Sequence, residues 1–199
     1  MKKNYEFNRV LKSDVVDFLD ESARIANLQL TMIDDIMTIS QECIQVLNNG
    51  GKLFFCGNGG SASDSQHLAA ELVNRFKKNR APIPAMALTT DTSVITSISN
   101  DFGFEYIFSK QIEAIARTND LLFAISTSGL SQNITEALKV AKDIGMKTVL
   151  FTGKSADTLE QYVDFLLCIP SDLTGVIQQA HITFGQAICM NIENSLESK

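Results

Sequence analysis

The chain of 199 residues has no tryptophan, three prolines and two histidines. It has four cysteines, but no two of them have the CxxC spacing, and each lies among apolar residues. We therefore expect buried thiols in a reducing compartment, not a disulfide framework. No apolar core follows the lysines near the start of the chain, so this segment does not resemble a secretory signal peptide.

The sequence also lacks a long apolar run and an excess of positive charge. Its longest uncharged stretch, residues 173–192, contains three glutamines, a histidine, an asparagine and two threonines, and is too polar for a membrane span. The net charge of −6 and the isoelectric point near 4.9 disfavour a broad interface with nucleic acid or an anionic membrane. The net negative charge does not exclude a small anionic ligand, because local backbone donors can bind it. We expect a cytoplasmic protein that contacts neither nucleic acid nor membrane directly.

Two apolar patterns divide the chain. Within residues 1–50, apolar side chains recur at helical spacing over 15–26 and again over 30–47, and glycines at 50 and 51 end the second stretch. This pattern predicts an N-terminal helical hairpin that packs on a neighbouring molecule. Beyond it, short apolar runs alternate with helical stretches, as in a parallel sheet with both faces covered. The predicted strands are Lys52–Cys56, Pro84–Leu88, Leu121–Ile125, Thr148–Phe151 and Phe165–Ile169.

The helical stretches complete the predicted architecture. They are Ser61–Phe76, Glu105–Ala116, Ser131–Ile144, a weaker one near Ala156–Tyr162, and Thr174–Ser195. We predict one α/β domain over residues 1–199, a three-layer sandwich with a five-stranded parallel sheet in which 51–199 form the core and 1–50 serve packing and oligomerisation. Ligands of such folds bind beyond the carboxyl ends of the strands, so the residues after each strand are informative.

Two loops at predicted strand ends favour an anionic ligand. Gly57-Asn58-Gly59-Gly60-Ser61 leads into a helix, where glycines allow close backbone approach and the helix N-terminus offers N–H groups. It is neither GxGxxG nor a P-loop, and a plain glycine turn is the alternative. Ser126-Thr127-Ser128-Gly129-Leu130-Ser131 places four hydroxyls at a second helix entry and predicts a phosphate site. Helix capping by Ser128 or Ser131 is the alternative, although a cap needs one hydroxyl.

A histidine and a carboxylate share one helix face after the glycine loop. His67 and Glu71 are four residues apart, and such a pair can share a metal ion or act as base and partner. An ordinary hydrogen-bonded surface pair is the alternative. Asn100 and Asp101 follow a segment rich in serine and threonine, and their side chains either bind sugar hydroxyls or form only a turn.

The last predicted helix carries uncharged polar side chains in an apolar setting. Gln178 and Gln186 are eight residues apart, which gives them one broad face. Their context indicates burial in a core or subunit interface, and packing with satisfied amides is the interpretation favoured by the residues alone. We interpret His181 as a structural residue.

Together these motifs resemble the sugar isomerase (SIS) superfamily and, within it, the phosphoheptose isomerases. The resemblance covers nearly the whole chain and is specific to this subfamily through His67 and Glu71. The other matching stretches are Cys56–Ser61, Asp64–Gln66, Ala70–Leu72, Arg75–Phe76, Ala87–Ser93, Asn100–Gly103, Ile125–Gly129, Thr152–Lys154 and Ile177–Gln178.

The resemblance implies a homotetramer with sites at subunit contacts. It implies conversion of a sugar phosphate, sedoheptulose 7-phosphate, to D-glycero-D-manno-heptose 7-phosphate, a step towards bacterial lipopolysaccharide or capsule. The phosphate would be held by Ser126, Thr127, Ser128 and Ser131. The sugar would contact Asn58, Gly59, Gly60, Ser61, Asn100 and Asp101, with Glu71 and Gln178 also at the substrate. Three zinc ligands would be His67, Glu71 and Gln178, and we expect Glu71 to be the base.

The last helix departs from the family pattern. Gln186 stands where the family has a histidine that is both zinc ligand and catalytic partner, and neutral residues also stand at Leu173, Val176 and Gln179. A glutamine amide cannot accept and return a proton, and its oxygen binds zinc more weakly than imidazole. With Gln186 as the fourth ligand, we expect weakened zinc. Three alternatives follow: an isomerase in which Glu71 is the one titrating group, a different isomerase, or a non-catalytic protein that binds a sugar phosphate or the replication initiator.

Overall fold

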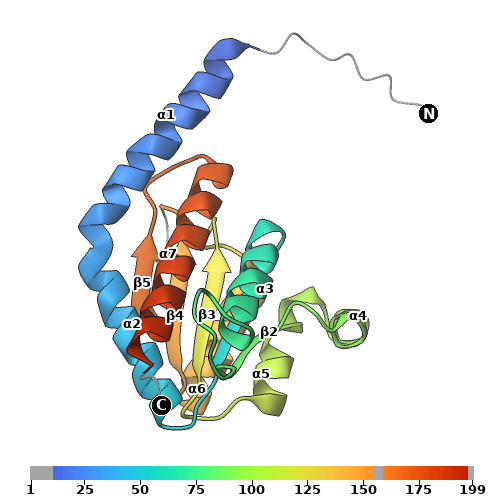
Figure 1. Ribbon diagram of the computed structural model, residues 1–199. Helices are drawn as coiled ribbons and strands as arrows, with labels where there is room; N and C mark the ends of the chain where they lie inside the picture. The colour runs from blue at the N-terminus through green and yellow to red at the C-terminus, as the bar shows by residue number, and fades with distance from the viewer. Residues whose placement is uncertain (1–10, 155–158, 197–199) are drawn as a thin grey trace, which may run out of the picture.

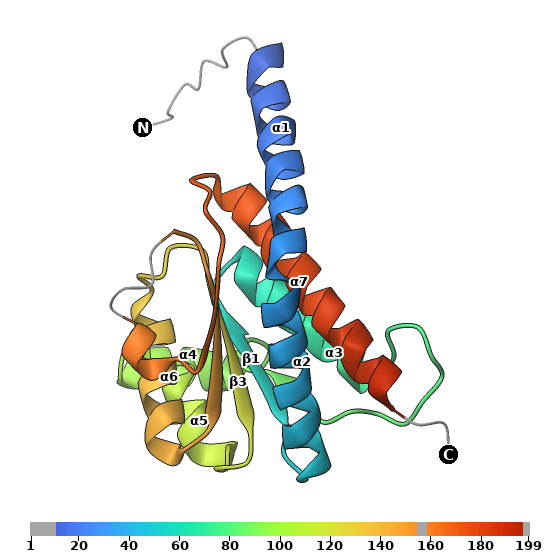
Figure 2. The ribbon, with the colours of Figure 1, turned by 90° about the vertical axis from the view of Figure 1, so that its left-hand side faces the viewer.

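The computed structural model describes residues 11–154 and 159–196. A sheet of five parallel strands, in the order β2-β1-β3-β4-β5, forms its centre. The strands are β1 (Leu53–Gly57), β2 (Ala85–Ala87), β3 (Leu121–Ser126), β4 (Lys147–Thr152) and β5 (Phe165–Cys168). Helices lie on both faces of the sheet (Figures 1 and 2). The predicted α/β sandwich is confirmed, and each strand end lies within one residue of its prediction.

Alternate side chains of β1, β3 and β4 enter two separate cores. One face is covered by α2 (Ile33–Asn48), α3 (Gly60–Val73) and α7 (Thr174–Ser195), and the other by α5 (Ser109–Ile115) and α6 (Gln132–Ile144). In β1, Leu53 and Phe55 belong to the first core, whereas Phe54 and Cys56 belong to the second. Both faces of the sheet are thus buried, which is why its strands are continuous apolar runs in the sequence.

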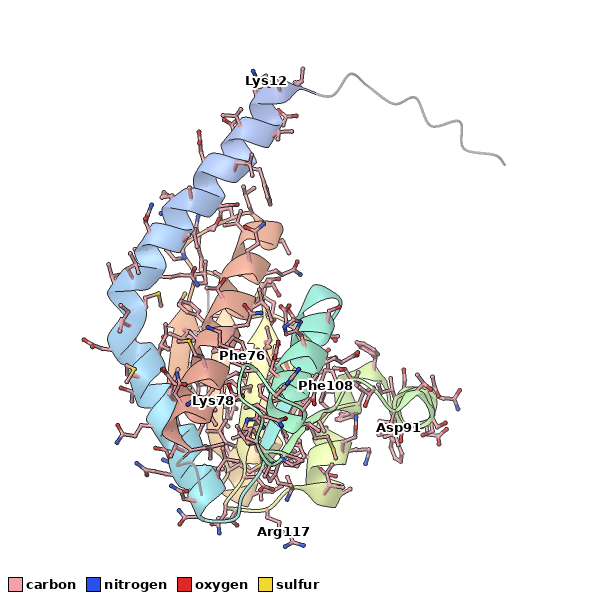
Figure 3. The ribbon with its side chains drawn as sticks, viewed as in Figure 1. Lys12, Phe76, Lys78, Asp91, Phe108 and Arg117 are labelled. Atoms are coloured by element: carbon pink, nitrogen blue, oxygen red, sulfur yellow. The ribbon has the colours of Figure 1, made fainter. Side chains whose placement is uncertain are left out.

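The N-terminal helices do not form the predicted hairpin. A 3-10 helix, Leu30–Met32, joins α1 (Lys12–Gln29) to α2, and the three run on as one bent rod (Figures 1 and 2). The prediction was wrong because the connection contains neither glycine nor proline, and Gln29, Leu30 and Ile33 have right-handed helical backbone angles. From Lys12, α1 projects beyond the sheet (Figure 3).

Two further helices differ from their predictions. A helix that we did not predict, α4 (Thr92–Asp101), starts at Asp91, whose side chain accepts the N–H of Val94 at 3.0 Å, and it lies away from the sheet (Figure 3). This helix was not predicted because its sequence is rich in serine and threonine, which favour caps and turns. The predicted helix Glu105–Ala116 is divided into a 3-10 helix, Phe104–Tyr106, and α5.

The remaining helices follow the sequence closely. The last helix has its predicted bounds, and α6 starts one residue later than expected. Near the weak helical stretch the structure has a 3-10 helix, Glu160–Tyr162, while residues 155–158 of that stretch lie outside the described residues. Among the residues that the structure covers, no helix combines the length and apolarity needed to cross a lipid bilayer. Cys43, Cys56 and Cys189 are buried as predicted, whereas Cys168 is partly exposed.

Candidate active site

The glycine loop after β1 allows the last helix to pack closely on the start of α3. Gly59 has φ +55°, in the left-handed region that favours glycine. A Cβ atom on Gly60 would lie 2.3 Å from Nε2 of Gln178, so a larger residue at this position would displace that side chain. The loop is therefore more than a plain turn, because its glycines fix where Gln178 lies.

The polar side chain of the glycine loop is tied to the helix after β3. Asn58 and Asn133 exchange two amide hydrogen bonds, each 2.8 Å long. Asn133 is 2% exposed, whereas Asn58 is half-buried. The predicted sugar contact Asn58 thus also fixes the distance between the glycine loop and α6.

The hydroxyl-rich loop after β3 turns back on itself. Ser126 Oγ accepts the N–H of Gly129 at 3.2 Å and lies 3.4 Å from Ser131 Oγ, and Ser128 Oγ accepts the N–H of Leu130 at 3.2 Å. Ser131 is the N-cap residue of α6, but its side chain makes no capping bond. The Ser131 hydroxyl therefore does not cap α6. It contacts the Ser126 hydroxyl within the loop instead.

The ends of β3 and β4 meet the start of α7 at the same edge of the sheet. The N–H of Gly153 donates to the carbonyl of Thr127 at 3.1 Å. A Cβ atom on Gly153 would lie 2.4 Å from this carbonyl oxygen and 3.1 Å from Ile177 Cδ1. The glycine loop, the hydroxyl loop and the first turns of α7 therefore converge at the carboxyl edge of the sheet, where ligands of such folds bind.

The predicted pair on α3 is formed, and α7 adds a third polar side chain. His67 Nε2 lies 3.0 Å from Glu71 Oε1 and 3.2 Å from Gln186 Nε2. The approach of α7 at this point depends on Gly185, since a Cβ atom there would lie 2.4 Å from the side chain of buried Leu68. Three of the predicted site residues are thus brought together by the contact between two helices.

Other predicted residues lie apart from this group. Gln178 packs on Gly60, about 10 Å before His67 along α3. Asn100 and Asp101 lie at the exposed end of α4, where Asn100 Nδ2 donates to Asp101 Oδ1 at 2.8 Å. The His67 side chain keeps 48% of its exposure and that of Glu71 keeps 22%, so within one chain the pair lies at the surface.

Two ionisable groups near the site, half-buried Asp64 and buried His181, lack full hydrogen bonding. Burial raises the pKa of Asp64 to about 6, partly opposed by neighbouring His67, and its Oδ2 has no hydrogen-bond partner among the described residues. Burial lowers the pKa of His181 to about 4, although its Nε2 lies 3.1 Å from the carbonyl oxygen of Thr152. His181 is fully buried, in accord with its interpretation as structural. From the sequence we assign no role to Asp64, although it precedes His67 by one helical turn.

Comparisons with known proteins assign this arrangement to a family. Residues 17–153 match the model of the SIS domain. The phosphoheptose isomerase of Roseiflexus sp. (strain RS-1) is 44% identical over 190 residues, covering 96% of this chain and 95% of the relative. That of Aliarcobacter butzleri is 45% identical and covers 94% and 99%. The chain belongs to the phosphoheptose isomerases, within the SIS domain family.

Solved phosphoheptose isomerases share the fold over nearly their full length. The structure from Francisella tularensis superposes with a TM-score of 0.88 at 34% identity, covering 92% of this chain and 98% of the other. The structure from Neisseria gonorrhoeae gives a TM-score of 0.86 at 38% identity, covering 93% and 100%. The family resemblance inferred from the motifs is confirmed.

The side chains at the site do not fit the zinc ion that the phosphoheptose isomerase resemblance implies. The three polar groups that meet there are one imidazole, one carboxylate and one neutral amide. Protein zinc sites use at least three strong nitrogen, sulfur or carboxylate ligands. Across residues 11–154 and 159–196, no three His, Cys, Asp or Glu side chains gather as a metal site, and Gln178 packs elsewhere. We therefore derive no catalytic step through zinc.

Proposed function

We propose that the chain is an aldose–ketose isomerase that converts sedoheptulose 7-phosphate to D-glycero-D-manno-heptose 7-phosphate in heptose biosynthesis. The observation that carries this proposal is the contact of Glu71 with His67, 3.0 Å apart, on the helix that leaves the glycine loop. The names of the relatives support the substrate. The acid–base pair on the helix that leaves the glycine loop and the anion loop at the end of β3 support the reaction class.

The proposed reaction moves one proton between adjacent carbons through an enediol. Glu71 takes a proton from C1 of the ketose and returns it at C2, while a second proton passes from O1 to O2. His67 orients the Glu71 carboxylate through Nε2. Gln186 cannot exchange protons, but its amide N–H can stabilise the negative oxygen of the enediolate. Its role in this proposal is that of a hydrogen-bond donor.

The hydroxyl loop holds the phosphate end of the substrate in this proposal. Ser126, Thr127, Ser128 and Ser131 supply neutral donors at the N-terminus of α6, where the helix dipole favours an anion. α3 runs back along the sheet from this edge, so the base lies well away from the phosphate. Such a separation suits a phosphate at the end of an extended seven-carbon chain opposite to the reacting carbons.

Glu71→Gln tests the function directly. The variant keeps the size of the side chain but cannot accept a proton, so we expect turnover of sedoheptulose 7-phosphate to fall by about 100- to 10,000-fold. Glu113→Gln, which changes an exposed carboxylate on α5, is the matched control and should leave turnover unchanged. Wild-type turnover equal to that of Glu71→Gln would reject the function.

A non-catalytic role is the second candidate, and Gln186 in place of the family histidine is what favours it. Such a protein would bind a sugar phosphate or the replication initiator without converting substrate. Calorimetry with sedoheptulose 7-phosphate and capture of the purified initiator decide between these roles. Binding of either one by a wild-type chain without turnover would establish the second candidate.

We also propose a homotetramer with a cytoplasmic location. Exposed apolar side chains along the projecting N-terminal rod support the assembly, and they are Leu11, Val15, Val16, Leu19, Leu30 and Ile33. The surface position of His67 and Glu71 is consistent with a site completed by a neighbouring subunit. Light scattering on the purified protein measures the assembly, and a monomer would reject it.

A further inference from the structure

A buried ion pair joins the end of α7 to the loop that follows α3. Arg80 Nε lies 3.0 Å from Glu193 Oε1, and the two side chains keep 7% and 2% of their exposure. Oε1 also accepts the N–H of Phe76 at 2.9 Å. Oε2 accepts those of Lys77 and Lys78, each at 2.8 Å. Each carboxylate oxygen therefore has two donors, which is the condition for burying a charge.

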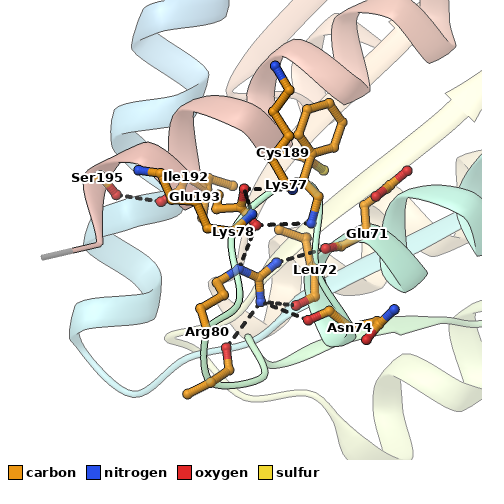
Figure 4. Close-up of polar contacts among 12 residues, drawn as sticks. Glu71, Leu72, Asn74, Lys77, Lys78, Arg80, Cys189, Ile192, Glu193 and Ser195 are labelled. Atoms are coloured by element: carbon orange, nitrogen blue, oxygen red, sulfur yellow. Dashed lines mark hydrogen bonds and ion pairs between the residues drawn. The ribbon is translucent and has the colours of Figure 1, made fainter. Parts of the chain in front are cut away.

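The guanidinium of Arg80 connects this pair to the helix that carries Glu71. Nη2 donates to the carbonyl of Glu71 and Nη1 to that of Leu72, both at 2.8 Å (Figure 4). The last carbonyls of a helix lack intrahelical partners, and a cation there also stabilises the negative end of the helix dipole. Arg80 thus holds the backbone of Glu71 itself, while Glu193 holds Arg80.

The site and the ion pair lie on one face of α7. Gln186 and Glu193 are seven residues apart, or about two helical turns. Gln186 contacts His67, and Glu193 reaches the C-terminus of α3 through Arg80. α3 is therefore fixed against α7 both at the site and just beyond it, with Glu71 between the two points.

We propose that Arg80 and Glu193 are positioning residues that hold the Glu71 carboxylate against His67. This inference rests on the proposed function, in which Glu71 moves the proton of the substrate. A displacement of about 1 Å can lower a rate by about 100-fold, so the chemical step depends on this ion pair. Binding of the phosphate does not depend on it, because the hydroxyl loop lies on other elements.

Glu193→Gln tests the inference kinetically. It puts an amide N–H₂ against backbone N–H donors, and we expect kcat to fall by about 10- to 100-fold with KM within about twofold. The primary isotope effect for the ketose deuterated at C1 should rise, because proton transfer becomes slower. Arg80→Lys keeps the positive charge beside Glu193, and its kcat should lie between that of wild type and that of Glu193→Gln. Lys147→Met, which removes the contact of an exposed lysine at the start of β4 with Glu42, is the control.

The histidine signals give a second measurement that does not require turnover. The chain has two histidines, and His181 is fully buried, so His67 has its own imidazole ¹⁵N resonances. Wild type and Glu71→Gln define their positions with and without the Glu71 contact. Glu193→Gln should move the His67 signals towards the Glu71→Gln position and leave those of His181 in place. Unmoved His67 signals, or a wild-type kcat in folded Glu193→Gln, would overturn the inference, whereas an inactive wild type overturns only the proposed function.

Discussion

The contact between α3 and α7 has two ends that differ in how their charges are satisfied. At the far end, burial would raise the pKa of Glu193, but the N–H groups of Lys78, Lys77 and Phe76 and the Arg80 guanidinium lower it to about 2. At the site end, burial raises the pKa of Asp64 to about 6, and no donor reaches its Oδ2 from the described residues. Burial alone therefore does not decide whether the pKa of these carboxyl groups is raised or lowered; the number of donors does.

This difference suits the tasks of the two ends. A fully paired charge is costly to break and gives the helices one relative position, which an exact acid–base geometry requires. The site end keeps an exposed imidazole and an unsatisfied carboxyl oxygen, so its groups can respond to a bound ligand. The same pair of helices thus carries a rigid ion pair at one end and groups that can bind a ligand at the other.

The largest expected effect comes from breaking the satisfied end. Arg80→Met leaves the Glu193 carboxylate buried without its cation, and we expect a loss of about 3–5 kcal/mol in the free energy of unfolding, measured in urea. Arg80→Met with Glu193→Leu removes both charges and should regain much of this loss. Equal stability of wild type and Arg80→Met would show that the charge of Glu193 is met by the backbone donors alone.

The pH dependence of the same variant follows from the lowered pKa of Glu193. Its ordinary value is 4.5 and its value in the folded chain is about 2. A lowered carboxyl pKa stabilises the folded chain above pH 4.5, and this contribution is lost as the pH falls from about 4.5 to about 2. The stability difference between wild type and Arg80→Met should therefore narrow over this interval.

Remodelling the site end is expected to have the next largest effect. Gln186→His adds a second imidazole beside His67 and Glu71, which completes three strong ligands, and we expect zinc affinity to rise by about 10- to 100-fold and turnover to rise with it. Calorimetry with zinc and the isomerase assay measure the two changes. If neither changes, residue 186 does not face the site.

The sequence predicted the site end better than the far end. The spacing of His67 and Glu71 predicts a contact within one helix, and the hydroxyls of residues 126–131 are neighbours along the chain, so both signals are local. The parallel sheet was equally predictable, because its buried strands are continuous apolar runs. The family resemblance also predicted that Gln186 lies beside His67.

The far end could not be predicted, because its partners are separated by more than a hundred residues. Arg80 lies in a basic loop, with Arg75, Lys77 and Lys78, and Glu193 lies near the end of an apolar helix. No pattern in either segment indicates the other as its partner. The N-terminal hairpin failed for a related reason: periodicity predicts helices but says nothing about the direction of the chain between them. Only the structure shows that a 3-10 helix, Leu30–Met32, flanked by right-handed helical Gln29 and Ile33, continues the chain without a reversal.

The smallest expected effect is the response of Asp64 to pH. Its ordinary pKa is 3.8 and its value in the folded chain is about 6, so the folded chain holds this proton more tightly than the unfolded one. Stability contributed by the protonated form is therefore lost as the pH rises from about 4 to about 6.

Asp64→Asn tests this response, because the asparagine cannot ionise. The difference in unfolding free energy between the variant and wild type should be about 1 kcal/mol more favourable to the variant at pH 7 than at pH 3, after allowance for the partial exposure of residue 64. Urea unfolding at the two pH values measures the gain, and Asp143→Asn, which changes an exposed carboxylate on α6, is the matched control. An equal difference at both pH values would mean that a donor from a neighbouring subunit or ligand satisfies Asp64, and the contrast between the two ends would then belong to the isolated chain alone.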